Sequence, residues 1–223
     1  MKVAIIGAGN VGKALGTSIG KAGHSVVFAS RGESAAAAAG EVGGSVAAAR
    51  EAAAQADLIV LAVPYGSAHD VANEIAPVAR GKVVIDATNP LAADLSGLAV
   101  EAGSSAAENL ASWLPGAAVV KAFNTMFASN MGNPGALGEK LDALFATDDA
   151  SAREAVAALI VSMGFQPVWV GGLSRARQLE AMAFLNITLQ VATGGYWNTA
   201  YKLVAPPAAS VEHRATAAAG AAR

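Results

Sequence analysis

The chain has no cysteine among its 223 residues, and charged residues make up only 14% of it. Without thiols it can form neither a disulfide framework nor a thiolate metal site, and it has no cysteine nucleophile. The formal net charge is −2, and the lysines and arginines are scattered along the sequence. It therefore lacks the clustered basic charge with which proteins hold nucleic acid. We expect no metal and no nucleic-acid partner.

Long uninterrupted apolar segments are also missing, although hydrophobic residues make up 54% of the chain. No run reaches the roughly 18 residues that a membrane-spanning helix needs. The N-terminus enters an apolar run directly, without the basic stretch and cleavage site of a signal peptide. Much of the apolar content is alanine, which favours helices and close packing. We expect a compact cytoplasmic protein that does not contact a membrane.

The first apolar run, Val3–Ile6, leads directly into a glycine-rich string. After a strand and before a helix, the first glycine of such a string allows a tight turn, the second admits a pyrophosphate, and the third allows close helix packing. The free N–H groups at the start of the helix would face the phosphates. The alternative is that the glycines serve only a tight turn. The string predicts a dinucleotide site made by Gly7, Ala8, Gly9, Asn10, Val11 and Gly12.

The end of the second strand indicates which dinucleotide is bound. NAD sites place a carboxylate there to accept hydrogen bonds from the ribose, whereas this strand ends in Ser30-Arg31. A guanidinium can hold two oxygens of a 2′-phosphate, and the serine hydroxyl can donate another hydrogen bond. We therefore expect NADP(H) with Ser30 and Arg31 as ligands. Two alternatives remain: Arg31 as a solvated loop charge, and Glu33 as a ribose acceptor.

Strand-like and helix-like segments alternate along nearly the whole chain. The expected strands are residues 3–6, 26–29, 45–47, 58–63, 82–87, 118–123, 141–146 and 166–170. The expected helices are residues 11–22, 49–55, 67–79, 106–114, 150–163 and 174–193. This pattern is typical of an α/β protein of the Rossmann type, with a doubly wound, mostly parallel sheet. The alanine-rich end after Pro206-Pro207 fits either a final helix or a loosely held tail.

Ligands of such sheets bind outside the carboxyl ends of the strands, so the residues there are the remaining site candidates. We expect the cofactor to meet Val63, Pro64, Tyr65, Ser67, Thr88, Lys121, Phe123 and Met126. The candidates beside the reacting ring are Asn89, Pro90, Asn124 and Thr125. Leu185 and Asn186 are candidates to close the pocket, within one subunit or from a partner subunit.

Each candidate also has a plain structural interpretation. The prolines can simply end strands, and the asparagines can satisfy backbone groups in turns. Lys121 is either an anchor for a negative ligand or a solvated lysine at a strand end, while Phe123 and Met126 either face a ring or belong to the core.

Acid–base residues are scarce at these strand ends. An alcohol or ketone dehydrogenase needs a proton donor or acceptor beside the nicotinamide. None of the histidines, His24, His69 and His213, follows one of the relevant strands, and no Tyr-x-x-x-Lys pair occurs. Hydride transfer between two rings needs stacking and orientation instead, because the rings carry the chemistry themselves.

The strings described above resemble the NADPH-dependent coenzyme F420 reductases, and they are similar to the cytosolic reductase domain of the six-transmembrane metalloreductases. They are Gly7–Lys13, Ser30-Arg31, Val63–Tyr65, Thr88–Leu91, Val120–Thr125 and Gly171–Arg177. The resemblance covers about residues 1–195. Archaeal F420 reductases have a histidine at the position matching Asn124, and the Lys121–Thr125 string is closer to the metalloreductase domain.

The resemblance implies a homodimer that passes hydride between NADPH and a deazaflavin (F420) or a flavin, FMN or FAD. It implies an NADP-binding Rossmann-type domain over 1–172 and a helical extension over 173–223, packed as one globular unit. The partner would then be a small-molecule redox acceptor. The alternative from a different class is an NADP(H)-binding sensor or redox module without turnover of its own.

Overall fold

The computed structural model describes residues 1–30, 34–135 and 137–204. The chain forms one eight-stranded sheet with the order β3-β2-β1-β4-β5-β6-β7-β8. The strands are β1 (Lys2–Ile6), β2 (Ser25–Ala29), β3 (Ser45–Val46), β4 (Leu58–Leu61), β5 (Val83–Asp86), β6 (Ala118–Ala122), β7 (Asp142–Ala146) and β8 (Gln166–Trp169). Every neighbouring pair is parallel except β6 and β7, which are antiparallel. The expected Rossmann-type fold is confirmed.

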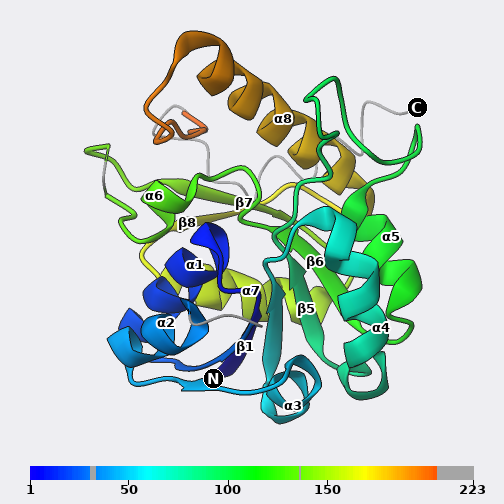
Figure 1. The fold of residues 1–223 in the computed structure, drawn as a ribbon. Coiled ribbons are helices and arrows are strands. Elements are labelled where there is room, and N and C mark those ends of the chain that lie inside the picture. Colours follow the sequence, from blue (N-terminus) through cyan, green and yellow to red (C-terminus); the bar gives the residue numbers. More distant parts are fainter. Residues whose placement is uncertain (31–33, 136, 205–223) are drawn as a thin grey trace, which may run out of the picture.

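Helices cover both faces of the sheet (Figure 1). They are α1 (Asn10–Lys21), α2 (Ser34–Val42), α3 (Ala49–Gln55), α4 (Ala68–Ala79), α5 (Ala106–Trp113), α6 (Ala128–Met131), α7 (Ala150–Ser162) and α8 (Ala176–Thr193). All the expected helices are present, with ends that differ by a few residues. Helices α2 and α6 were not predicted, because α2 is almost uniformly apolar and α6 is a single turn.

Alternate residues of β1 point into two separate cores, as the period of two in a strand requires. In β1, Val3 and Ile5 face the core that includes Leu15 of α1. Ala4 and Ile6 face the second core, which includes Ile75 of α4. Figure 1 shows α1 and α2 on one side of the sheet and α4 and α5 on the other. Buried strands of this kind read as continuous apolar runs, which explains why they were predicted well.

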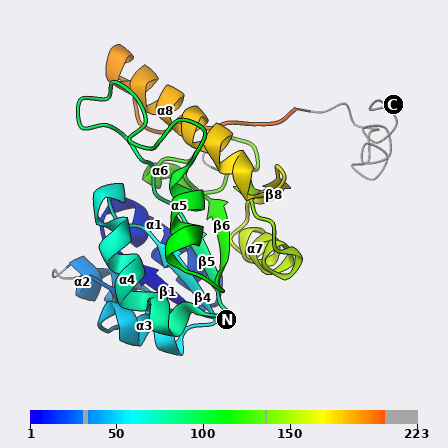
Figure 2. The ribbon, with the colours of Figure 1, turned by 90° about the vertical axis from the view of Figure 1, so that its right-hand side faces the viewer.

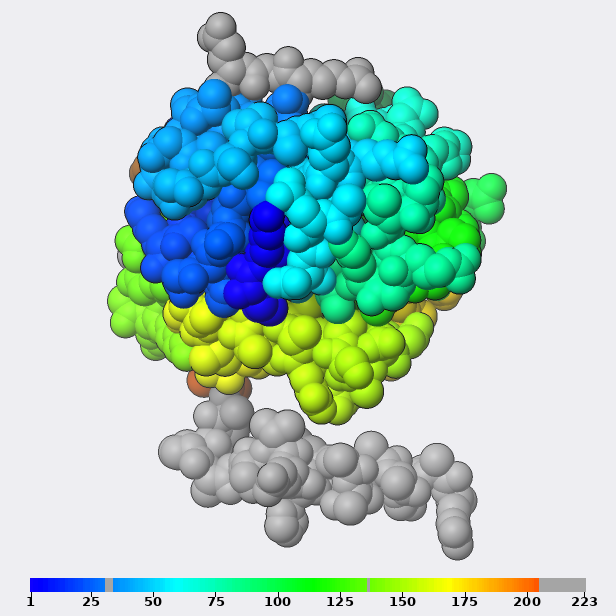
Figure 3. Space-filling model, turned by 90° about the horizontal axis from the view of Figure 1, so that it is seen from below, coloured from blue at the N-terminus to red at the C-terminus, as the bar shows by residue number. Residues whose placement is uncertain are grey.

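Helix α8 lies across the end of the sheet where the parallel strands finish, and Figures 1 and 2 agree on this placement. The opposite end is formed by the beginnings of the strands. Figure 3 views that end and shows the N-terminal residues, in dark blue, at the surface. There the backbone N–H of Lys2 donates to Asp57, and His24 lies beside the N-terminal amino group. The ends of β1, β4, β5 and β6 therefore point toward the side of the molecule that carries α8.

Candidate dinucleotide site and the neighbouring strand ends

The turn after β1 has the geometry that the glycine string predicts. Gly7 adopts a φ of +103°, and a Cβ there would collide with the carbonyl oxygen of Ala62. A Cβ on Gly12 would overlap the carbonyl oxygen of Gly7. Only glycine fits these two positions, because one needs a left-handed backbone and the other brings α1 against the turn.

Gly9 differs from its two neighbours in the string. A Cβ on Gly9 would meet no atom within 4 Å. Gly9 is the N-cap of α1, and no side chain caps this end of the helix. The first N–H groups of α1 and the open space above Gly9 thus form a cradle for an anion, as a pyrophosphate site requires.

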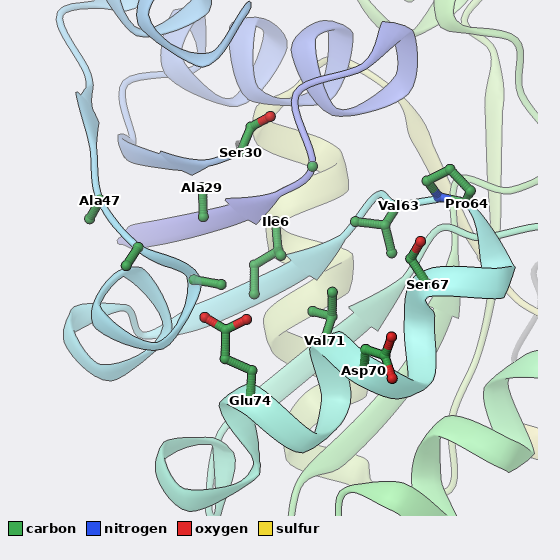
Figure 4. A pocket seen from close by; sticks show the side chains of 13 residues that line it. Ile6, Ala29, Ser30, Ala47, Val63, Pro64, Ser67, Asp70, Val71 and Glu74 are labelled. Atoms are coloured by element: carbon green, nitrogen blue, oxygen red, sulfur yellow. The ribbon is translucent and has the colours of Figure 1, made fainter. Parts of the chain in front are cut away.

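A pocket of about 480 Å³ lies beside this turn (Figure 4). It contains the ends of β1 and β2 together with the segment after β4. Five predicted ligands line it: Gly7, Ser30, Val63, Pro64 and Ser67. The structure therefore brings together residues that are up to 60 positions apart in the chain (7 to 67). Arg31 and Glu33, the other predicted residues of this region, lie outside the described residues.

The rest of the lining was not predicted. Ala47, Ala48 and Ala49 form one wall, and Asp70, Val71 and Glu74 of α4 form another. Nothing distinguishes these alanines from the many others in the sequence. The acidic residues recur at the i, i+4 spacing of one helix face, which could have indicated that they lie together.

Tyr65 is not among the lining residues of this pocket. Its hydroxyl accepts a hydrogen bond of 2.8 Å from Asn109 of α5, and its ring stacks on Trp113 at 6.3 Å between centroids. His69 contacts the same tryptophan edge-on. Tyr65, in the turn before α4, and His69 of α4 thus pack against α5, and the structure gives Tyr65 a packing contact where we expected a cofactor contact.

At the ends of β5 and β6, Asn89 and Asn124 bind each other in both directions. The Asn89 amide donates to the Asn124 carbonyl at 3.0 Å, and the Asn124 amide donates to Asn89 Oδ1 at 3.0 Å. The Asn124 amide also donates to the carbonyl of Leu179 on α8. Sequence reasoning placed these asparagines at the ends of two strands, and the structure shows that the strands are neighbours and joins the asparagines directly.

Two buried oxygens near this pair have no hydrogen-bond partner among the described residues: Asn124 Oδ1 and Thr88 Oγ1. Both residues are nearly inaccessible, at 4% and 3% exposure. Buried polar atoms are normally satisfied, so these two oxygens are candidates for a contact with water or a ligand. Both oxygens lie in the segments after β5 and β6, where the contacts to the nicotinamide end of a dinucleotide were predicted.

Lys121 is the largest departure from the predicted site. Its side chain is fully buried, and Nζ lies 2.9 Å from Asp86, 2.8 Å from Glu180 and 2.7 Å from the carbonyl of Thr88. The solvated alternative is therefore wrong. The expected ligand contact is not available to Lys121 either, because the three donors of its ammonium group already bind these three acceptors.

Glu180 connects the same network to α5. Its carboxylate accepts hydrogen bonds from the backbone N–H groups of Ala106 and Ala107, at the start of α5, and pairs with Lys121. Burial raises the pKa of Glu180, and the charge of Lys121 opposes that shift. Sequence reasoning missed Glu180 because it occupies a helix far along the chain.

Most of the remaining predicted residues lie in the interior. Phe123 and Met126 belong to the core that includes Leu15 of α1, which agrees with their structural interpretation. Thr125 is buried, and Pro90 is buried next to the partly exposed Asn89. Asn186 accepts a hydrogen bond of 2.7 Å from Thr199 instead of closing the pocket, and Leu185 is exposed.

A strand–turn–helix with an open second glycine, beside a pocket at the end of β2, defines a Rossmann-type dinucleotide-binding protein. The family profile described as "NADP oxidoreductase coenzyme F420-dependent" matches residues 2–90. An F420-dependent NADP reductase of Methanothermobacter thermautotrophicus is 36% identical over 211 residues, which cover 86% of this chain and 90% of that protein. The chain belongs to this family of NADP-dependent oxidoreductases.

Two further relatives agree with this assignment. The solved structure of a candidate F420-dependent NADP reductase from Arthrobacter sp. FB24 superposes with a TM-score of 0.83 at 29% identity, covering 92% of this chain and all of that one. Metalloreductase STEAP3 of Rattus norvegicus is 32% identical over 184 residues, which cover 81% of this chain but only 36% of that protein. The resemblance to both groups is confirmed.

In the part of the chain that the structure describes, no helix combines the length and hydropathy needed to cross a bilayer. The same part contains no cluster of three or more histidine, aspartate or glutamate side chains suited to a metal ion.

Proposed function

We propose that the protein transfers hydride between NADPH and the deazaflavin ring of F420. The observation that carries this proposal is the asparagine pair at the ends of β5 and β6, with an unsatisfied acceptor on Asn124. Family membership supports the NADP half, and two of the similar proteins are named for F420.

In this proposal the protein binds and orients two rings. The α1 N-terminus and Gly9 hold the pyrophosphate, and the pocket beside β2 holds the adenosine half. Asn124 Oδ1 then accepts a hydrogen bond from the nicotinamide carboxamide, which fixes the face that the ring presents. The nicotinamide and the deazaflavin supply the hydride chemistry themselves.

The ionisable groups nearest to this pair support ring-to-ring transfer. Asp86, Lys121 and Glu180 are buried and bonded to one another and to backbone groups. They hold strand ends and α8 together and are not available to move a proton to or from a substrate hydroxyl. A flavin is the second acceptor candidate, favoured by the similarity to the metalloreductase.

The test is to mix purified protein with NADPH and add F420, FMN or FAD in separate reactions, following NADPH oxidation by absorbance. We expect F420 to accelerate it. If only FMN or FAD accelerates NADPH oxidation, the acceptor is a flavin and not F420. If NADPH binds and no acceptor accelerates its oxidation, the sensor interpretation replaces the enzyme.

We further propose that the protein is a homodimer in which α8 faces a partner subunit. Ala181, Leu185, Leu189 and Ala192 recur on one face of α8, and all are exposed, Leu185 at 64% and Leu189 at 51%. An apolar helix stripe of this kind marks an interaction surface. Light scattering should give twice the monomer mass for the wild type and the monomer mass for Leu185→Glu; a monomeric wild type would refute the proposal.

A further inference from the structure

Glu74 places a carboxylate in a pocket whose other walls are mostly small and apolar. It projects from the second turn of α4 toward the side of the pocket that holds Ala29 and Ala47 (Figure 4). Asp70, one turn earlier on the same face, also lines the pocket. These two acids are the only charged side chains among the described lining residues.

No structural role accounts for Glu74 within the described residues. It forms no hydrogen bond or ion pair there, and its neighbours at i±3 and i±4 on the helix, Val71, Pro77, Asp70 and Val78, are not basic. Asp70 differs because it lies in the first turn of α4, where a carboxylate favours the helix N-terminus. The carboxylate of Glu74 gains nothing comparable from the helix.

The pocket is placed for the adenosine half of a dinucleotide. It includes the end of β2 and continues from the turn that holds the pyrophosphate. Ala47–Ala49 on one side and Val71 on the other offer apolar walls suited to a planar base. Ser30 and Glu74 lie on opposite sides of the pocket (Figure 4). Repulsion from Glu74 would keep a 2′-phosphate on the Ser30 side and leave the Glu74 side to the base.

We infer that Glu74 is a specificity residue that accepts a hydrogen bond from the 6-amino group of adenine. An ionised carboxylate only accepts hydrogen bonds, and adenine presents donors at position 6, where guanine and hypoxanthine present a carbonyl oxygen. The side chain thus selects an adenine dinucleotide over one with a 6-oxo base. The inference rests on the proposed NADPH binding and specifies which base that site accepts.

The test measures dissociation constants of NADPH and of its analogue in which hypoxanthine replaces adenine, for the wild type and for Glu74→Gln. We expect the wild type to bind the analogue about tenfold more weakly, as for a lost hydrogen bond to a charged group. In Glu74→Gln the ratio of the two dissociation constants, analogue over NADPH, should fall to about twofold or invert, because the amide N–H can donate to the 6-carbonyl. Glu74 is exposed, so the substitution should leave the melting temperature unchanged.

Asp70→Asn is the matched control, because it removes the same charge from the same face of α4. The ratio of its dissociation constants for the two nucleotides should equal that of the wild type. A ratio that is unchanged in Glu74→Gln, or that changes equally in Asp70→Asn, would overturn the assignment and reduce Glu74 to a general negative charge. These outcomes leave NADPH binding intact, whereas a wild type that binds neither nucleotide would overturn the proposed function and this inference with it.

Discussion

Lys121 of β6 and Glu180 of α8 form an ion pair with a separation of 2.8 Å and no solvent exposure on either side chain. Asp86 completes the cluster from β5, so one ammonium group meets two carboxylates. The pair attaches α8 to the strand ends that carry Asn89 and Asn124, and Glu180 also binds the start of α5. The cluster therefore sets the position of α8 over the proposed nicotinamide side of the site.

Replacing Lys121 with methionine should destabilise the protein by about 3–5 kcal/mol, because two buried carboxylates would lose their counter-charge. Chemical denaturation measures this change. Lys13→Met removes the ion pair with Glu41, in which both side chains are 46% exposed, and should change stability little. Equal effects of the two substitutions would contradict a structural role for the buried cluster.

Glu180→Gln should flatten the pH dependence of stability. Burial raises the pKa of Glu180 in the folded protein, so the folded state holds this proton more tightly than the unfolded state does. Wild-type stability contributed by this group is therefore lost as pH rises from the ordinary glutamate range through the raised folded pKa. Melting temperatures across that range should fall less for the variant.

Glu108→Gln provides a control, because the pH dependence of stability that Glu108 contributes has the opposite sign. The hydrogen bonds from Arg177 lower the pKa of Glu108, so its contribution is present above the ordinary glutamate pKa and is lost as pH falls through the lowered one. A Glu180→Gln protein whose melting temperature follows the wild type at every pH would show that Glu180 does not titrate with folding.

Gly9 and Gly12 should respond differently to alanine. In Gly12→Ala the new Cβ overlaps the carbonyl of Gly7, so both the melting temperature and NADPH affinity should fall. In Gly9→Ala the Cβ meets no protein atom and the backbone angles suit alanine, so stability should be retained while NADPH binding weakens. Thermal melts with and without NADPH separate the two effects. If Gly9→Ala retained NADPH affinity, the assignment of the pyrophosphate to this position would be wrong.

Arg31→Ala should weaken NADPH binding far more than NADH binding, by about tenfold or more for a lost pair with the 2′-phosphate. Arg31 lies outside the described residues, but the described lining of the pocket contains only acidic charged groups. The positive charge that a 2′-phosphate needs must then come from another part of the chain. Titrations with both nucleotides test this, and equal losses would refute the assignment.

Asn124→Leu keeps the volume of the side chain and removes its amide. We expect a lower rate of hydride transfer with a smaller change in NADPH affinity, because in the proposed complex the amide orients the nicotinamide, and in the structure it binds Asn89. Asn73→Leu, at an exposed position of α4, should leave the rate unchanged. A loss of affinity with an unaltered rate would make Asn124 a binding residue alone.

Much of the architecture could be predicted because the responsible forces are local. The apolar runs of the parallel strands follow directly from burial on both faces. The role of Gly12 follows from its contact with Gly7 five residues earlier, and Gly7 is recognised by its place in the glycine string, although the atom its Cβ would meet belongs to the distant Ala62. The direction of β7 could not be predicted, since a fully buried strand has the same pattern in parallel and antiparallel pairing.

The sequence by itself determined the Rossmann-type sheet, the glycine turn and the strand ends that form the site. Tertiary structure alone decided which charges are paired and which side chains reach the pocket. Lys121 pairs with Glu180, which lies 59 residues later in the chain (121 to 180). Glu74 lines a pocket that is formed mainly by other elements. Hydrogen bonds and ion pairs act over a few ångströms in space, so the partners of a side chain depend on how helices cross the sheet, which no local pattern encodes.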